Sequence, residues 1–277
     1  MKNLILLPFL IALLNCNAMA AQQKYMTFNV RFDNPADGED RWELRKKELC
    51  NMIQKHDPDF IGIQEALPNQ VDYIDAELQQ YKYTGFGRDG EGTDSESVPI
   101  FYKPEAFELI RTDVFWLSAT PDIPSKGWDA SLNRITTYGT FRNKMTGDTL
   151  HVFNTHYDHR GEKARVNSSR LLIEKLKTGK LLDKKVILMG DFNSRPEEEP
   201  IQILNETLAD AQTNSEHEVR GPYGTFNGFD VSARLAQRID YVFVLNMRVL
   251  NYTAIEDKRK NGRWISDHLP VLAEVSH

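Results

Sequence analysis

Short apolar runs that stop at a polar residue able to do chemistry recur along the whole chain. Residues 24–30 alternate between apolar and polar side chains as a strand does, and the later runs have the length and composition of buried strands. Because strand ends gather at the rims of sheets, residues far apart in the sequence are expected to meet at one cleft. The polar residues at these positions are Asn29, Glu65, His156, Asp158, Asp191, Asn193, Asp240, Asp267 and His268.

Helical patterns separate the predicted strands. Residues 41–56 and 162–176 have the spacing of amphipathic helices, and Pro68 fits the first turn of another. Strands and helices mixed in this order predict an α/β fold of two packed sheets with helices outside. An exposed acidic loop is predicted at 87–97, and the remaining strands are predicted near Ile100 and at 107–110, 115–117, 135–141, 249–255 and 269–275.

The first twenty residues are typical of a secretory signal peptide. Lys2 precedes an apolar run, and Ala18-Met19-Ala20 provides a small-residue cleavage site. We therefore expect cleavage of residues 1–20, a domain over 21–277, and export to the periplasm or the outside. The apolar run is shorter than the roughly 20 residues that span a membrane, so no stable membrane insertion is expected. A lipid anchor on Cys16 is less favoured, because the bulky Asn15 precedes it.

Cysteine and charge narrow the possibilities further. After cleavage only Cys50 remains, so no intramolecular disulfide can form, and we expect a monomer held together by one large core. The full chain carries 34 Lys and Arg against 40 Asp and Glu, a formal charge of -6. Long duplex nucleic acid is bound mainly through its phosphate charge, so this balance disfavours a nonspecific nuclease, although nucleic acid stays possible as a partner.

The polar residues supply what hydrolysis of a phosphate ester needs: neutralised phosphoryl oxygens, an oriented water and a stabilised leaving oxygen. Glu65 and Asp267 suit a hard cation such as Mg²⁺, which prefers oxygen ligands. Asp191 can orient or deprotonate the water, and Asn193, predicted to alternate onto the same side of the strand, can hold the phosphate. Each carboxylate can instead be a strand-end charge or close a turn.

The two histidines have separate predicted roles. His156, as an imidazolium, can hydrogen-bond a phosphoryl oxygen. A buried Asp240 can fix the tautomer of His268 and raise its pKa, although this pair can also be an ordinary core hydrogen bond. A zinc site built from His156 and His159 is a less favoured alternative, because no third nitrogen or sulfur ligand lies nearby in sequence.

Taken together, six motifs resemble the successive motifs of the endonuclease/exonuclease/phosphatase superfamily, the group with the deoxyribonuclease-I-like fold. Their order and spread cover nearly all of the chain after residue 20. The motifs are Thr27-Phe28-Asn29-Val30-Arg31, Ile63-Gln64-Glu65, Asn154-Thr155-His156, Gly190-Asp191-Phe192-Asn193, Arg238-Ile239-Asp240-Tyr241 and Ser266-Asp267-His268.

The resemblance implies a four-layer α/β/β/α sandwich of two mixed sheets flanked by helices, with the site at the top of the sheets. It also implies a role for each matching position. Metal ligands are Glu65 and Asp267. The catalytic set is Asp191, His156 and the pair His268 and Asp240, and the phosphate-binding set is Asn193, Asn29 and Arg134.

Details of the motifs refine the resemblance. Many relatives have an acidic residue where this chain has Arg31, so a one-metal site is favoured. The segment 154–162 resembles secreted bacterial members related to the deadenylase group. By the same similarity, Trp128 is expected to line the cleft with Arg134, and Thr225 to lie near the site.

The prediction is therefore a phosphoesterase that uses Mg²⁺ or Mn²⁺ to cleave a diester or a monoester with water, with a 3'-5' exonuclease-like nuclease as one form. Alternatives are a phosphatase acting on a small sugar phosphate, an inositol phosphate or a lipid headgroup, and a phosphate-binding module without catalysis. The sequence does not distinguish these substrates, because one fold hosts many chemistries.

Overall fold

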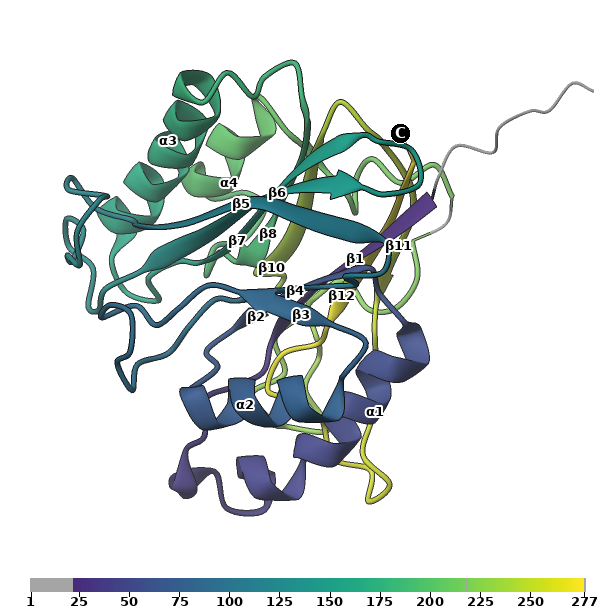
Figure 1. Ribbon diagram of the computed structural model, residues 1–277. Helices are drawn as coiled ribbons and strands as arrows, with labels where there is room; N and C mark the ends of the chain where they lie inside the picture. The colour runs from purple at the N-terminus through teal and green to yellow at the C-terminus, as the bar shows by residue number, and fades with distance from the viewer. Residues whose placement is uncertain (1–21, 218, 277) are drawn as a thin grey trace, which may run out of the picture.

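The computed structural model describes residues 22–217 and 219–276, which form two six-stranded sheets packed face to face with helices on both outer sides (Figure 1). This arrangement confirms the predicted α/β/β/α sandwich. The predicted signal peptide at 1–20 lies outside the described residues. Within those residues, no helix has the length and apolar composition needed to cross a membrane.

The first sheet has the strand order β11-β12-β1-β2-β4-β3. Its central pair, β1 and β2, is parallel, and α1 (Lys46–His56) lies between these two strands in the chain. Two short 3-10 helices, Pro35–Asp40 and Trp42–Leu44, precede α1, and α2 (Pro68–Glu77) follows β2. The strands are β1 (Gln22–Asn29), β2 (Phe60–Gln64), β3 (Lys82–Thr84), β4 (Ile100–Tyr102), β11 (Arg248–Ala254) and β12 (Val271–Ser276).

The second sheet has the order β5-β6-β7-β8-β10-β9. Its parallel pair is β7 and β8, joined through α3 (Glu162–Thr178), and α4 (Glu199–Asn205) packs beside α3. The strands are β5 (Phe107–Trp116), β6 (Ile135–Asn143), β7 (Thr149–His156), β8 (Lys185–Asp191), β9 (Ala209–Asp210) and β10 (Asp240–Leu245).

Alternating side chains on the central strands build three layers of core. In β8, Ile187 and Met189 pack between the two sheets, whereas Val186 and Leu188 pack against the side covered by α3 and α4. In β1, Tyr25 joins the layer between the sheets and Met26 joins the layer under α1 and α2. Both faces of the central strands are therefore buried, which is why their sequences are so rich in apolar residues.

Most predicted elements are present, with a few corrections. The strands predicted at 107–110 and 115–117 are one strand, β5, which crosses an irregularity between Leu109 and Arg111. Its exposed middle lies at the edge of the sheet, so it lacks the apolar pattern of a buried strand. Helix α1 begins at Lys46 and not at residue 41. The short elements β3, β9 and α4 were not predicted.

A polar contact joins the two sheets below the strand ends. The side-chain amide of Asn154 on β7 donates to the carbonyls of Ile63 (2.8 Å) and Pro99 (2.9 Å), and accepts from Gln64 (2.6 Å). Gly62 leaves room for it, because a Cβ there would lie 2.6 Å from the Asn154 Oδ1 atom. These buried hydrogen bonds fix how the sheets meet under the predicted site.

The one cysteine among the described residues lies on the buried face of α1, where Cys50 is 2% exposed. Burial raises the pKa of its thiol to about 12. Because the thiolate is the reactive form, we expect the folded chain starting at residue 21 to resist Ellman's reagent and to react fully in guanidinium chloride. Rapid reaction in native buffer would contradict this packing.

Candidate active site

Strand pairing brings the predicted site residues to one end of the sandwich. The parallel register of β7 and β8 places His156 beside Asp191, and the antiparallel register of β8 and β10 places Asp240 opposite Asp191. Gly190 permits the close approach of β7, because a Cβ there would lie 2.1 Å from the Thr155 carbonyl oxygen. On the other sheet, Asn29 ends β1 beside Gln64, the residue before Glu65.

These residues surround a cavity of about 400 Å³. Asn29 and Asp240 are fully buried and lie behind the side chains that line it. Trp128, which was predicted to line the cleft, is not among the lining residues. The predicted residues that do line the cavity are Glu65, Arg134, His156, Asp191, Asn193, Asp267 and His268.

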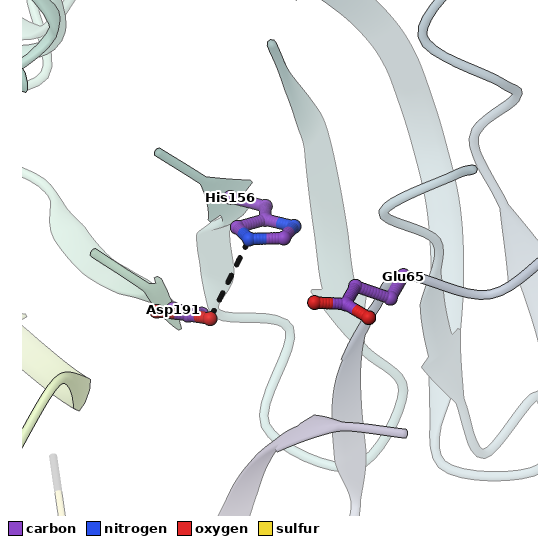
Figure 2. Close-up of side chains that lie close together, drawn as sticks. All are labelled: Glu65, His156 and Asp191. Carbon is purple, nitrogen blue, oxygen red and sulfur yellow. Dashed lines mark ion pairs between the residues drawn. The ribbon is translucent and has the colours of Figure 1, made fainter. Parts of the chain in front are cut away.

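Asp191 is the buried centre of the group and is 1% exposed. Its Oδ2 atom accepts from the Asn29 amide at 2.9 Å and lies 3.5 Å from His156 Nε2 and 3.8 Å from His268 Nε2. Figure 2 shows His156 and Asp191 turned toward each other, with Glu65 beside them. Burial and the negative charge of Asp240 raise the pKa of Asp191, which brings this carboxylate closer to the range of an effective general base.

His268 and Asp240 form the predicted pair. Nδ1 of His268 lies 2.9 Å from Asp240 Oδ2, and Thr225 donates its hydroxyl to the same oxygen at 2.5 Å. Burial alone lowers the pKa of His268, but the charges of Asp240 and Asp191 outweigh burial and raise it well above its ordinary value. The expected pKa direction agrees with the structure, and the contact of Nδ1 with Asp240 leaves Nε2 of His268 facing Asp191 at 3.8 Å.

The contacts of His156 favour a neutral ring over the predicted imidazolium. Arg134 Nη1 lies 3.0 Å from His156 Nδ1, and burial together with the Arg134 charge lowers the pKa of His156 well below its ordinary value. A guanidinium can only donate, so Nδ1 accepts and the ring hydrogen is on Nε2. The Asn193 amide nitrogen, 3.2 Å from Nε2, is itself a donor, so in this tautomer it is a neighbour of the ring and not its hydrogen-bond partner. His156 can therefore still donate to a phosphoryl oxygen, but without a positive charge of its own.

Asn193 reaches the cavity through a turn and not through strand alternation. Strand β8 ends at Asp191, and Asn193 has a left-handed backbone with φ 46°. Its backbone N–H donates to Asp191 Oδ1 at 2.9 Å, and its amide donates to the Tyr157 carbonyl at 3.0 Å. The turn interpretation is confirmed, and the turn places Asn193 on the wall of the cavity.

Arg134 and Asn29 were predicted to bind the phosphate, but their side-chain N–H groups already contact other residues of the site. The two Nη atoms of Arg134 lie against His156 and His159, so this cation supports the imidazoles on the cavity wall. The Asn29 amide donates to Glu65 (3.0 Å) and Asp191 (2.9 Å) and sets the spacing between these carboxylates.

The chemistry of the carboxylates fits a divalent cation on the Glu65 side of the cavity. Burial raises the pKa of Asp267, and the charge of Glu65 contributes to this rise. The Nε atom of Arg31 lies 3.9 Å from the Asp267 carboxylate and closer, at 3.0 Å, to the Asp37 carboxylate, so Asp267 receives only part of this positive charge. Two carboxylates that face one cavity and repel each other are stabilised when a cation binds between them.

Ligand atoms of Glu65, His156 and Asp191 also lie within 4.8 Å of one another, as do those of Asp191, Asp240 and His268. Neither cluster contains Asp267, so ligand distances alone do not select the predicted Glu65 and Asp267 pair. Electrostatics disfavours both clusters, because the Arg134 guanidinium lies against His156 and because Asp240 and Asp191 raise the pKa of His268, which favours a proton over a metal ion on its ring. We therefore keep Glu65 and Asp267 as the candidate ligands.

The zinc alternative is disfavoured by the same contacts. His156 and His159 each present Nδ1 to one Arg134 guanidinium, at 3.0 and 3.1 Å. A cation in that position repels a dication between the two rings. In the clusters found within the described ranges 22–217 and 219–276, no group combines these two histidines.

Sequence analysis did not identify several residues of the cavity wall. Glu96 was assigned to an exposed loop, yet it lines the cavity and pairs with Arg88 at 2.7 Å. Phe226 packs edge-on against His268, with ring centroids 5.0 Å apart. The acidic composition of 87–97 concealed Glu96, and a lone Phe in a turn carries no recognisable signal. Other wall residues are Arg31, Phe32, Leu132, His159, Gln237 and Ile239.

Comparisons with known proteins agree with this geometry. Residues 26–268 match the model of the endonuclease/exonuclease/phosphatase family. A mannosyl-6-phosphatase of Bacteroides thetaiotaomicron is 36% identical with a TM-score of 0.86, and the match covers 92% of this chain and all (100%) of that structure.

More distant matches are also present. An uncharacterised protein of Acanthamoeba polyphaga mimivirus is 30% identical over 84% of this chain and 91% of its own length. The human Nocturnin catalytic domain, solved with sulfate, is 22% identical with a TM-score of 0.71, covering 92% of this chain and 93% of that one, and at this identity it shows the fold alone.

Proposed function

The chain belongs to the endonuclease/exonuclease/phosphatase family, whose members are hydrolytic phosphoesterases, and on this premise we propose that it is a divalent-metal-dependent phosphatase that releases phosphate from a phosphorylated sugar. The observation that carries the proposal is the arrangement of Asp191 between His156 and His268, with Glu65 and Asp267 on the wall of the same cavity.

Each residue of the cavity has a proposed role. Asp191 accepts a proton from the attacking water, since its raised pKa makes it a better base than an ordinary carboxylate. His268 donates from Nε2 to a phosphoryl oxygen, and its positive charge limits the rise in the pKa of Asp191. Asn193 and His156 hold the remaining phosphoryl oxygens through N–H groups.

Glu65 and Asp267 would hold the ion. Members of the family are typically dependent on divalent metal, and we propose Mg²⁺ or Mn²⁺ because the two ligands are carboxylates. When bound, the ion would supply positive charge to the phosphoryl group. Arg31 brings positive charge where many relatives were expected to have a carboxylate, which supports a single ion. Metal analysis of protein purified without added ions distinguishes this from zinc.

Two observations support a sugar phosphate over nucleic acid. The relative named as a mannosyl-6-phosphatase is 36% identical over 92% of this chain. The cavity wall carries Glu96 beside Glu65, Asp191 and Asp267, and the chain is acidic overall, so a polyanionic strand gains little attraction. Export and a monomeric state remain predictions from the sequence, and we propose them on that basis.

The experiment is a substrate panel with the chain from residue 21. Mannose 6-phosphate, p-nitrophenyl phosphate, bis(p-nitrophenyl) phosphate and single-stranded DNA are compared at equal Mg²⁺ concentration. We expect the monoesters to be cleaved and the sugar phosphate to have the highest kcat/KM. Preference for either diester would refute the phosphatase assignment. Binding of inorganic phosphate without turnover of any substrate would indicate a binding module.

A further inference from the structure

Glu96 and His159 line the cavity near Arg134 and have no role in the proposed chemistry at phosphorus. Arg134 Nη2 lies 3.1 Å from His159 Nδ1, and Arg134 Nε lies 3.6 Å from Asp158. Glu96 and Arg134 also line a small recess that adjoins the cavity, so Glu96 belongs to the same part of the wall. Arg134 is only 5% exposed, whereas Glu96 and His159 reach the cavity.

The contact with Arg134 determines which nitrogen of His159 carries hydrogen. A guanidinium has no acceptor, so Nδ1 of His159 must accept and the ring hydrogen is on Nε2. Burial and the Arg134 charge also lower the pKa of His159, which is the direction expected for a ring held against a guanidinium. His159 therefore offers one N–H donor at the rim of the cavity.

Glu96 offers the complementary acceptor. Its Oε2 accepts from Arg88 at 2.7 Å, and no described residue donates a hydrogen bond to the other carboxylate oxygen. The loop that carries it is anchored, because Trp116 donates its ring N–H to the Arg88 carbonyl at 2.6 Å and the Arg88 N–H donates to the Glu96 carbonyl at 2.9 Å. The acceptor is thus held in place before a ligand arrives.

We propose that Glu96 and His159 form a hydroxyl-binding subsite for the polyol part of the leaving group, an inference that rests on the proposed phosphatase function. A sugar polyol carries hydroxyls that can both donate and accept, so it suits a wall that presents both a carboxylate oxygen and an imidazole N–H. The negative charge of Glu96 disfavours a second phosphate at this position. The subsite therefore selects an uncharged polyol bearing one phosphate.

The test compares a substrate with hydroxyls and a substrate without them. For Glu96→Ala and for His159→Ala, the ratio of kcat/KM for mannose 6-phosphate to kcat/KM for p-nitrophenyl phosphate should fall about tenfold to a hundredfold, as expected for loss of a hydrogen bond that involves a charged or well-held group. The fall should come mainly from a higher KM for the sugar phosphate. Glu91→Ala and His217→Ala, at exposed positions outside the cavity, are the matched controls.

The outcomes separate the two proposals. If both variants keep the wild-type ratio of the two kcat/KM values, or if kcat/KM falls equally for both substrates, the subsite is overturned and the phosphatase function stands. Wild-type protein that cleaves neither monoester would instead refute the proposed function. Thermal melting of each variant shows whether it folds, and the His159→Ala variant tests the subsite even if loss of the Arg88 ion pair makes Glu96→Ala unstable.

Discussion

Replacing Asp191 by Asn lowers kcat for phosphate release by about 10³-fold to 10⁴-fold, the upper part of the range for loss of a general base. The amide cannot accept the proton of the attacking water, and it removes the charge that faces His268 at 3.8 Å. Asn has nearly the same shape, but its single amide oxygen cannot accept from both the Asn193 backbone and the Asn29 amide, so one buried donor loses its partner. We therefore expect little change in KM and a lower melting temperature with the fold retained, measured by steady-state kinetics and circular dichroism.

Asp183→Asn is the matched control for that variant, because Asp183 follows α3 on the surface, beyond the cavity. It should retain wild-type activity. If Asp191→Asn kept more than about a tenth of the wild-type rate, Asp191 would not be the general base. Loss of a general base usually lowers the rate by at least about 100-fold.

Replacing Glu65 by Gln raises the Mg²⁺ concentration needed for half-maximal activity by about 100-fold or more, because even indirect supports of a metal ligand typically contribute 10-fold to 100-fold in affinity. Glu65 has a left-handed backbone (φ 66°) and accepts hydrogen bonds from Asn29 and from the Phe32 backbone, so its carboxylate is fixed in direction. The neutral amide keeps the shape but loses the charge that attracts a cation.

The measurement is a Mg²⁺ titration of activity, with calorimetric titration of the metal as an independent readout. Glu77→Gln on the exposed side of α2 should titrate like the wild type. An unchanged Mg²⁺ requirement in Glu65→Gln would move the ion away from Glu65 and toward another cluster of carboxylates.

Much of the architecture could be predicted because the core obeys simple periodicity. Ile187 and Met189 alternate with Val186 and Leu188, so the β8 sequence already specifies a strand buried on both faces. A charged residue at the end of such a strand is therefore a candidate for a functional site. That reasoning predicted that Asp191 and His156 meet, and the parallel register of β7 and β8 places them side by side.

What could not be predicted depends on contacts between distant segments. The pKa of His156 is lowered by burial and by Arg134, which is 22 positions earlier in the chain. The buried guanidinium of Arg45 donates to the carbonyls of Val30, Arg31 and Ile265, and so fixes the backbone next to Asn29 and near Asp267. An arginine at the start of a helix gives no sign of this role, because its partners are backbone atoms.

The substrate could not be predicted from the sequence either. Substrate choice depends on the residues that line the cavity around the leaving group, and not on the residues at the reacting phosphorus. The motifs locate Asp191, His268 and Glu65, which any phosphate ester would need. Glu96 and Phe226, which shape the space around a leaving group, belong to loops whose composition predicts only exposure.

The most direct test of metal-dependent hydrolysis is one rate measurement on the chain from residue 21. Phosphate release from mannose 6-phosphate is followed in Mg²⁺, after removal of metal with EDTA, and after Mg²⁺ is restored, with Asp191→Asn in parallel. We predict release that stops with EDTA, returns with Mg²⁺ and is nearly absent in the variant. Equal release in EDTA and by Asp191→Asn would contradict the account, because neither the ion nor the central carboxylate would then take part.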